Sequence, residues 1–72
     1  MKTPLLTTTL ARAGHICSFE IQPFADGWEA SRREDHRVVQ EQCHSDWHGV
    51  ERTLTRFNRE IATLREQGWV DA

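Results

Sequence analysis

The 72-residue chain has few cysteines, few glycines and no long apolar run, and each of these absences excludes a class of protein. Cys17 and Cys43 are too few for a disulfide framework and lack the paired short spacing of a zinc finger or ribbon. No apolar segment approaches the roughly 20 residues that a membrane-spanning helix needs. No glycine-rich loop is present to hold a phosphate group. We therefore expect a small protein without membrane association or cofactor.

The net charge and the N-terminal segment exclude further classes of protein. Nine Lys and Arg against eleven Asp and Glu give a formal net charge of -2, which offers no electrostatic reason to bind nucleic acid or an anionic membrane. Residues 1–14 are interrupted by Pro4 and Gly14 and are too polar for a secretory signal, so we expect a cytoplasmic protein. The same residues predict either a flexible N-terminal arm or a short edge strand over Leu6 to Ala11, which three consecutive threonines favour.

The strongest pattern in the chain lies between Ser45 and Trp69. Apolar residues recur there at spacings of three and four, which places them on one stripe of an α-helix: Trp47, Val50, Leu54, Phe57, Ile61 and Leu64. Ser45 or Asp46 can cap the helix start, and Gly68 can end the helix in a left-handed conformation. The stripe would also fit a coiled-coil seam, but it is short and rich in aromatics, so we expect it to pack on the protein's own sheet.

Alternating apolar and polar residues predict strands before the helix. The first strand starts at His15, and its apolar side holds Cys17, Phe19 and Ile21. Residues 23–27 should form a turn, with Asp26-Gly27 supplying the positive backbone dihedral of a hairpin loop. A second strand begins at Trp28, and a third runs from about Arg37 to His44. We expect a single α+β domain over residues 15–72, a three-stranded antiparallel β-meander with one long C-terminal helix on one face (βββα).

Four histidines and two cysteines raise the question of a metal or catalytic site. Cys43, His44 and His48 are close in sequence, and His15 or Cys17 could complete a zinc cluster from the neighbouring strand. Adjacent strand residues point to opposite faces, however, which argues against a shared ion. A cysteine nucleophile would also need an orienting group and an oxyanion donor that the sequence does not offer. We expect no metal ligands, no catalytic residues and a protein that is not an enzyme.

An arginine row supports an alternative hypothesis of nucleic-acid binding. Residues able to contact phosphates lie around the second turn and along the helix: Arg33, Arg37, Arg52, Arg56 and Arg59. Acidic neighbours weaken the positive field, and Arg56 with Glu60 is expected to form an ordinary helix-surface pair. By topology, three strands and a helix resemble the DNA-binding domains of the plant ethylene-response type and of some phage-type integrases. The exposed strand residues expected here include Glu20, Glu29 and Glu41, which would repel phosphates.

A second resemblance rests on short motifs. They are Asp26-Gly27-Trp28-Glu29, Trp47-x-x-Val50-Glu51-Arg52 and Leu64-Arg65-x-x-Gly68-Trp69. With these motifs the chain resembles small uncharacterised bacterial proteins built as a Gly-Trp β-hairpin followed by one helix. The resemblance covers about residues 16–69, and it implies a structural scaffold without an established activity.

A surplus of apolar residues is the best functional clue in the sequence. The chain holds more aromatic and aliphatic side chains than a small core can hide, and such a surplus is typical of an interaction surface. Trp28, Val38 and Trp69 are the interface candidates. The leading hypothesis is therefore a small protein-interaction or homodimerisation module, one version of which is a phage or mobile-element inhibitor of a larger bacterial complex.

Overall fold

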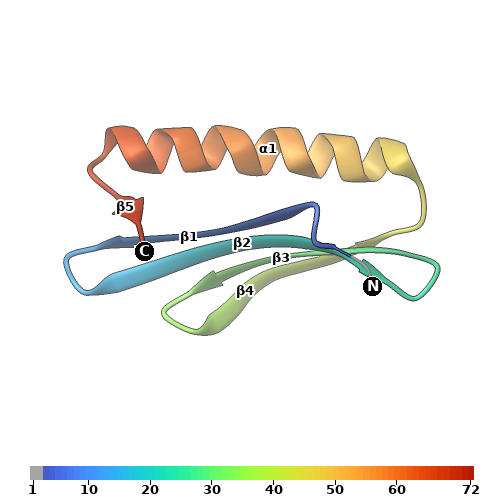
Figure 1. Cartoon of the computed structure of the whole chain (residues 1–72), viewed down its shortest axis with the longest axis horizontal. Coiled ribbons are helices and arrows are strands. Elements are labelled where there is room, and N and C mark those ends of the chain that lie inside the picture. The colour runs from blue at the N-terminus through green and yellow to red at the C-terminus, as the bar shows by residue number, and fades with distance from the viewer. Residues whose placement is uncertain (1–2) are drawn as a thin grey trace.

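The computed structural model describes residues 3–72, which form one antiparallel sheet and one helix. The elements are β1 (Leu6–Arg12), β2 (His15–Phe24), β3 (Gly27–Glu34), β4 (Arg37–His44), α1 (Trp47–Glu66) and β5 (Val70–Asp71). The strands β1 to β4 form a meander, and α1 lies along one face of it (Figure 1). Strand β5 then pairs with the outer edge of β1, so the sheet order is β4-β3-β2-β1-β5. The fold class is α+β, as the sequence predicts.

The expected count of three strands is wrong. Residues Leu6–Arg12, which we interpreted as an arm or a short edge strand, pair with β2 along their whole length, from Leu6 opposite Ile21 to Arg12 opposite His15. The two-residue strand β5 adds a further neighbour to β1. The first two residues of the expected arm lie outside the described part of the chain. No helix among residues 3–72 combines the length and apolar character needed to cross a membrane.

The turn after β2 differs from the expectation. The left-handed backbone conformation falls on Ala25, at φ 53°, whereas Gly27 has no positive φ and already belongs to β3. A Cβ atom at Gly27 would collide with the main-chain oxygen of His44 on the neighbouring strand. The glycine is therefore required by the close approach of two strands and not by the turn.

Both ends of α1 form as the sequence predicts. At the start, Asp46 Oδ1 accepts a hydrogen bond of 3.0 Å from the Gly49 amide, which satisfies one of the orphan donors of the first turn. At the end, Gly68 has φ 98° and donates to the Arg65 carbonyl, while Trp69 donates to the Leu64 carbonyl at 3.0 Å. This pair of bonds is a Schellman motif, which stops the helix and returns Trp69 towards the sheet.

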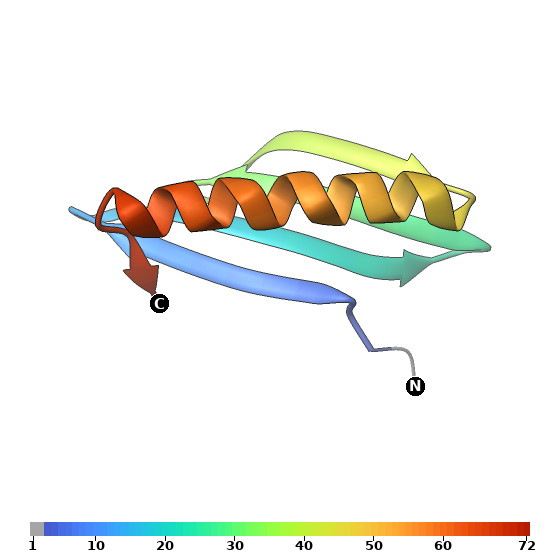
Figure 2. The ribbon, with the colours of Figure 1, turned by 90° about the horizontal axis from the view of Figure 1, so that it is seen from above.

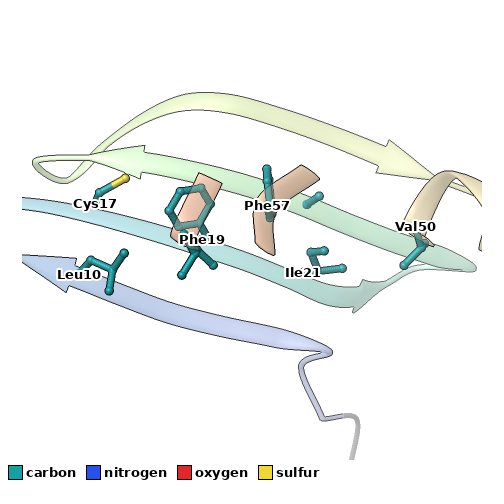
Figure 3. Packing of buried hydrophobic residues seen from close by; sticks show 8 residues of the cluster. Leu10, Cys17, Phe19, Ile21, Val50 and Phe57 are labelled. Carbon is teal, nitrogen blue, oxygen red and sulfur yellow. The ribbon is translucent and has the colours of Figure 1, made fainter. Parts of the chain in front are cut away.

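The core lies between α1 and the inner strands (Figure 3). Its buried residues are Leu10, Cys17, Phe19, Ile21, Ala30, Val50, Phe57 and Ile61. The rings of Phe19 and Phe57 meet edge to face, with centroids 5.2 Å apart. The helical stripe thus packs on the protein's own sheet, apart from its first member. Trp47 was expected in the core, but it is 48% exposed because it lies at the helix start, beyond the buried stripe.

The helix lies over the middle of the sheet and does not cover its β4 edge. Figure 2 shows α1 above the middle strands, with β4 displaced to one side. The residues of β4 that share the helix-facing side with Trp28, Ala30 and Arg32 are polar: Gln40, Gln42 and His44. Val39 and Cys43, expected together on one face of the third strand, are both exposed, and a bulge between Arg32 and Arg33 interrupts the β3–β4 pairing there. The helix-facing side of β4 is therefore polar and lies next to the helix, outside the apolar core.

Candidate functional site: an aromatic end and an arginine flank

Three aromatic residues lie at the end of the molecule where the β2–β3 hairpin meets the start of α1, with Trp28 on the helix-facing side of the sheet and Phe24 on the opposite side. They are Phe24, Trp28 and Trp47, and we call this surface the aromatic end; it lies on the right in Figure 1. The indoles of Trp28 and Trp47 meet edge to face, with ring centroids 5.8 Å apart. Phe24 is 55% exposed and Trp47 is 48% exposed. Large apolar side chains with this exposure remain available for an intermolecular contact.

A hollow of about 360 Å³ lies beside these aromatics. Its walls come from the hairpin and from the segment leading into α1, and include Phe24, Trp28, Cys43 and His44. His44 is held from the helix side, because its Nε2 atom lies 2.9 Å from the Thr53 hydroxyl. The wall formed by β4 is therefore held against α1, and the hollow is a shallow, largely apolar depression that a side chain could contact.

The structure does not bring the three predicted interface residues together. Trp28 belongs to the aromatic end. Val38 is 50% exposed and lies at the other end of the sheet, next to the β3–β4 turn. Trp69 is half-buried against the core and lines a separate hollow of about 260 Å³ with Cys17 and Arg32. These positions assign only Trp28 to an aromatic surface.

The cysteines and histidines do not form a cluster. Cys43 is exposed, and it lies on the opposite side of β4 from His44. His15, at the far end of the sheet, lies 3.0 Å from a carboxylate oxygen of Asp35. Burial raises the pKa of the Cys17 thiol, which disfavours the reactive thiolate. Among residues 3–72 no three His, Cys, Asp or Glu side chains are grouped to hold a metal ion.

Three exposed arginines lie within seven residues of one another on α1, and one of them, Arg56, contacts β4. The three are Arg52, Arg56 and Arg59, and we call them the arginine flank. Arg56 Nη2 donates a hydrogen bond of 3.0 Å to Gln42 Oε1, which places this member of the flank directly beside β4. Within the described residues, none of the three forms an ion pair with a carboxylate. The flank therefore carries three positive charges that are not held in ion pairs within the described residues.

The expected pair between Arg56 and Glu60 does not form. Glu60 Oε2 instead lies 3.5 Å from Arg32 Nε, and a second nitrogen of Arg32 contacts Glu34 at 2.9 Å. Two acidic groups thus form ion pairs with Arg32 on β3. Glu60 therefore forms no ion pair with the helix arginines, although it adjoins Arg59 in sequence as Glu51 adjoins Arg52.

The other two members of the arginine row lie elsewhere. Arg33 is on the sheet face away from the helix, where it lines a narrow hollow of about 160 Å³ with Glu20 and Ser31. Arg37 is the first residue of β4 and lies next to the β3–β4 turn, at the end of the strand away from the aromatic end. Glu29 and Glu41 pair across β3 and β4 with neighbours on that same outer face. The outer sheet face therefore combines one arginine with three glutamates, which disfavours phosphate contacts.

Phe24 and Trp47 belong to the surplus of apolar residues in the sequence, but the pattern alone does not single them out as interface candidates. Phe24 follows the alternating strand and precedes a turn, a position that commonly places a side chain at a hairpin tip. Trp47 continues the helical stripe, so the pattern alone assigned it to the core. The position of Trp47 immediately after the Asp46 cap was the available signal, because the first turn of a helix can extend past the surface it packs on.

Comparison of the chain with known protein families, curated proteins and solved structures finds no match. The resemblance to small bacterial proteins with a Gly-Trp hairpin therefore stays a prediction.

Proposed function

We propose that the protein is a non-enzymatic protein-interaction module that forms a homodimer through the aromatic end. The observation that carries this proposal is the exposure of Phe24 and Trp47 beside a hollow lined by Trp28 and Cys43. Burying a large aromatic side chain is worth about 1.5–3 kcal/mol. Exposed tryptophans and phenylalanines that flank a pocket are typical anchors of protein interfaces.

A second copy of the chain suits this surface because it is self-complementary. A closed two-fold dimer uses the same patch on both subunits, so that patch must supply both a protruding side chain and a cavity to receive it. The aromatic end has both, in Phe24 and the adjoining hollow. We infer that each copy inserts its Phe24 ring beside Trp28 of the other.

The shape of the molecule limits the strength of this dimer. The two shorter extents are 22 and 21 Å, so a contact confined to one end buries less than the roughly 800 Å² per partner of a standard interface. We therefore expect a weak dimer that dissociates on dilution.

Sedimentation equilibrium over a concentration series tests the proposal. The wild-type chain should shift from monomer to dimer as concentration rises, and Phe24→Ser should remain monomeric over the same range. Val70→Ser is the matched control, since Val70 is 63% exposed but lies at the opposite end of the molecule. A monomeric wild type, or equal weakening by both substitutions, would contradict an interface at the aromatic end.

The cellular setting of the module is part of the proposal. Cys43 is an exposed free thiol and Cys17 is a buried one, which suits a reducing compartment such as the cytoplasm. A role as a phage or mobile-element inhibitor of a larger bacterial complex is consistent with a small binding module, and it stays a hypothesis.

A further inference from the structure

The outer edge of β4 is a second surface with unused binding capacity. Strand β4 ends the sheet, so in the described part of the chain its outer backbone groups have no neighbouring strand. The bulge affects the half next to the β3–β4 turn, whereas Gln40–His44 pair regularly with β3. Five regular residues present an edge of about 17 Å. An extended peptide can add to such an edge through main-chain hydrogen bonds.

The helix that carries the arginine flank runs beside β4 (Figure 2). Arg56 contacts Gln42, the central residue of the five. Successive arginines of the flank are four and three residues apart, which corresponds to about 6 and 4.5 Å along the helix axis. Alternate side chains of an extended peptide are about 6.6 Å apart. Long arginine side chains can therefore meet carboxylates carried at every second position of an added strand.

The sheet face away from the helix determines which side chains fit at the other positions of an added strand. Glu41 and Cys43 lie on the side of β4 away from the helix, where Glu41 would repel a carboxylate on an added strand. Neutral or apolar side chains fit that side. A nucleic acid would meet the same repulsion and has no use for the backbone edge, so a polypeptide suits the surface better.

We propose that the β4 edge and the arginine flank bind an extended acidic segment of a partner protein, whose carboxylates occupy alternate positions and face the helix. This site adjoins the aromatic end at Cys43 and His44, which line the hollow there, but it does not depend on self-association. The site has two components. One is the outer main-chain groups of Gln40–His44, which have no neighbouring strand in the described part of the chain, and the other is the three arginines, which form no ion pair with a described carboxylate.

Fluorescence anisotropy with labelled peptides tests the pattern. The alternating peptide Thr-Glu-Val-Glu-Val-Glu-Thr should bind at least about tenfold more tightly than Thr-Val-Glu-Glu-Glu-Val-Thr, which has the same composition and charge. Binding should weaken when salt rises from about 0.05 to 0.5 M. Equal binding of both peptides would overturn the proposal, because it would show simple charge attraction without strand pairing.

Variants of the protein locate the contact. Arg56→Glu should weaken binding of the alternating peptide by about tenfold or more, because it reverses a charge at the centre of the flank. Arg33→Glu makes the same charge change on the opposite sheet face and should leave binding unchanged. Circular dichroism confirms that both variants fold. Equal losses in the two variants would exclude the flank as the site.

Methylated peptides test the backbone contact. Methylating one alternate set of peptide amides removes the donors that face β4, whereas methylating the other set removes donors that face solvent. We expect one methylated peptide to lose binding and the other to retain it. Loss of neither would overturn strand addition. Binding of a single-stranded oligonucleotide that Arg56→Glu abolishes, in the absence of peptide binding, would also overturn the proposal and identify the surface as a nucleic-acid site.

Discussion

Strands β2 and β4 belong to the same sheet, but their helix-facing sides differ in chemistry. Cys17, Phe19 and Ile21 of β2 are all buried under α1, whereas β4 presents Gln40 and Gln42. Apolar burial therefore holds the helix on the inner strands. Strand β4 is held by its ladder with β3 and by polar contacts to α1, and this is why it keeps an edge and a side available for partners.

Removing the ring of Phe57 should produce the largest loss of stability, because this ring is part of the apolar core between α1 and the inner strands. Phe57 is fully buried against Phe19, and a substitution of this kind costs about 3–5 kcal/mol. Gln42→Ala removes only an exposed hydrogen bond with Arg56 and should cost less than about 0.5 kcal/mol.

Urea unfolding followed by circular dichroism measures both changes. Phe57→Leu removes less volume than Phe57→Ala and keeps a folded baseline if the alanine variant does not fold. Comparable losses in the Phe57 and Gln42 variants would show that β4 contributes as much to the core as the inner strands do.

Two glycines test how closely β4 approaches its neighbours. Gly27→Ala places a methyl group against the main-chain oxygen of His44, and backbone cannot move aside cheaply, so we expect a loss of about 1–3 kcal/mol. Gly49→Ala meets the His44 ring, with a Cβ-to-Nδ1 separation of 2.7 Å, and the side chain can shift. Thermal unfolding should therefore rank Gly27→Ala as the more damaging substitution. The reverse order would show that the His44 ring is more rigidly held than the strand.

The smallest effect should come from the turn that ties β4 to the inner strands. The Ile16 amide donates to Asp35 Oδ1 and the His15 ring contacts Oδ2, and these hydrogen bonds lower the pKa of Asp35. A carboxyl whose pKa falls on folding stabilises the protein above its unfolded pKa, about 3.9, and loses that contribution as the pH drops through the folded value.

Asp35→Asn should therefore lower the melting temperature slightly at neutral pH. The difference from the wild type should close as the pH falls to about 2. A difference that stayed constant across this range would show that the charge of Asp35 is not its source.

Much of the fold follows from local patterns in the sequence. The period-two alternation found β2, and the three-four spacing found α1 and its Gly68 stop. Strand β1 was harder, because Thr8 stands between Leu6 and Leu10 on the helix-facing side and breaks the alternation. Strand β5 has two residues and forms only because the helix end returns the chain to β1.

The candidate site was predictable in kind but not in place. The surplus of aromatics indicated an interface, yet the meeting of Trp28 with Trp47 depends on how the hairpin and helix pack. The arginines could be found in the sequence, but the structure was needed to show that Arg33 lies on the sheet face away from the helix. The contact of Glu60 with Arg32, in place of the expected pair with Arg56, required the structure.

The indole N–H signals of the three tryptophans provide the most direct test of the central claim. In a dilution series followed by NMR, the signals of Trp28 and Trp47 should move together as the dimer dissociates. The signal of Trp69, which packs at the opposite end of the helix, should stay in place. Movement of Trp69 with Trp28 and Trp47 fixed, or no movement of any of the three at concentrations where the mass doubles, would contradict an interface at the aromatic end.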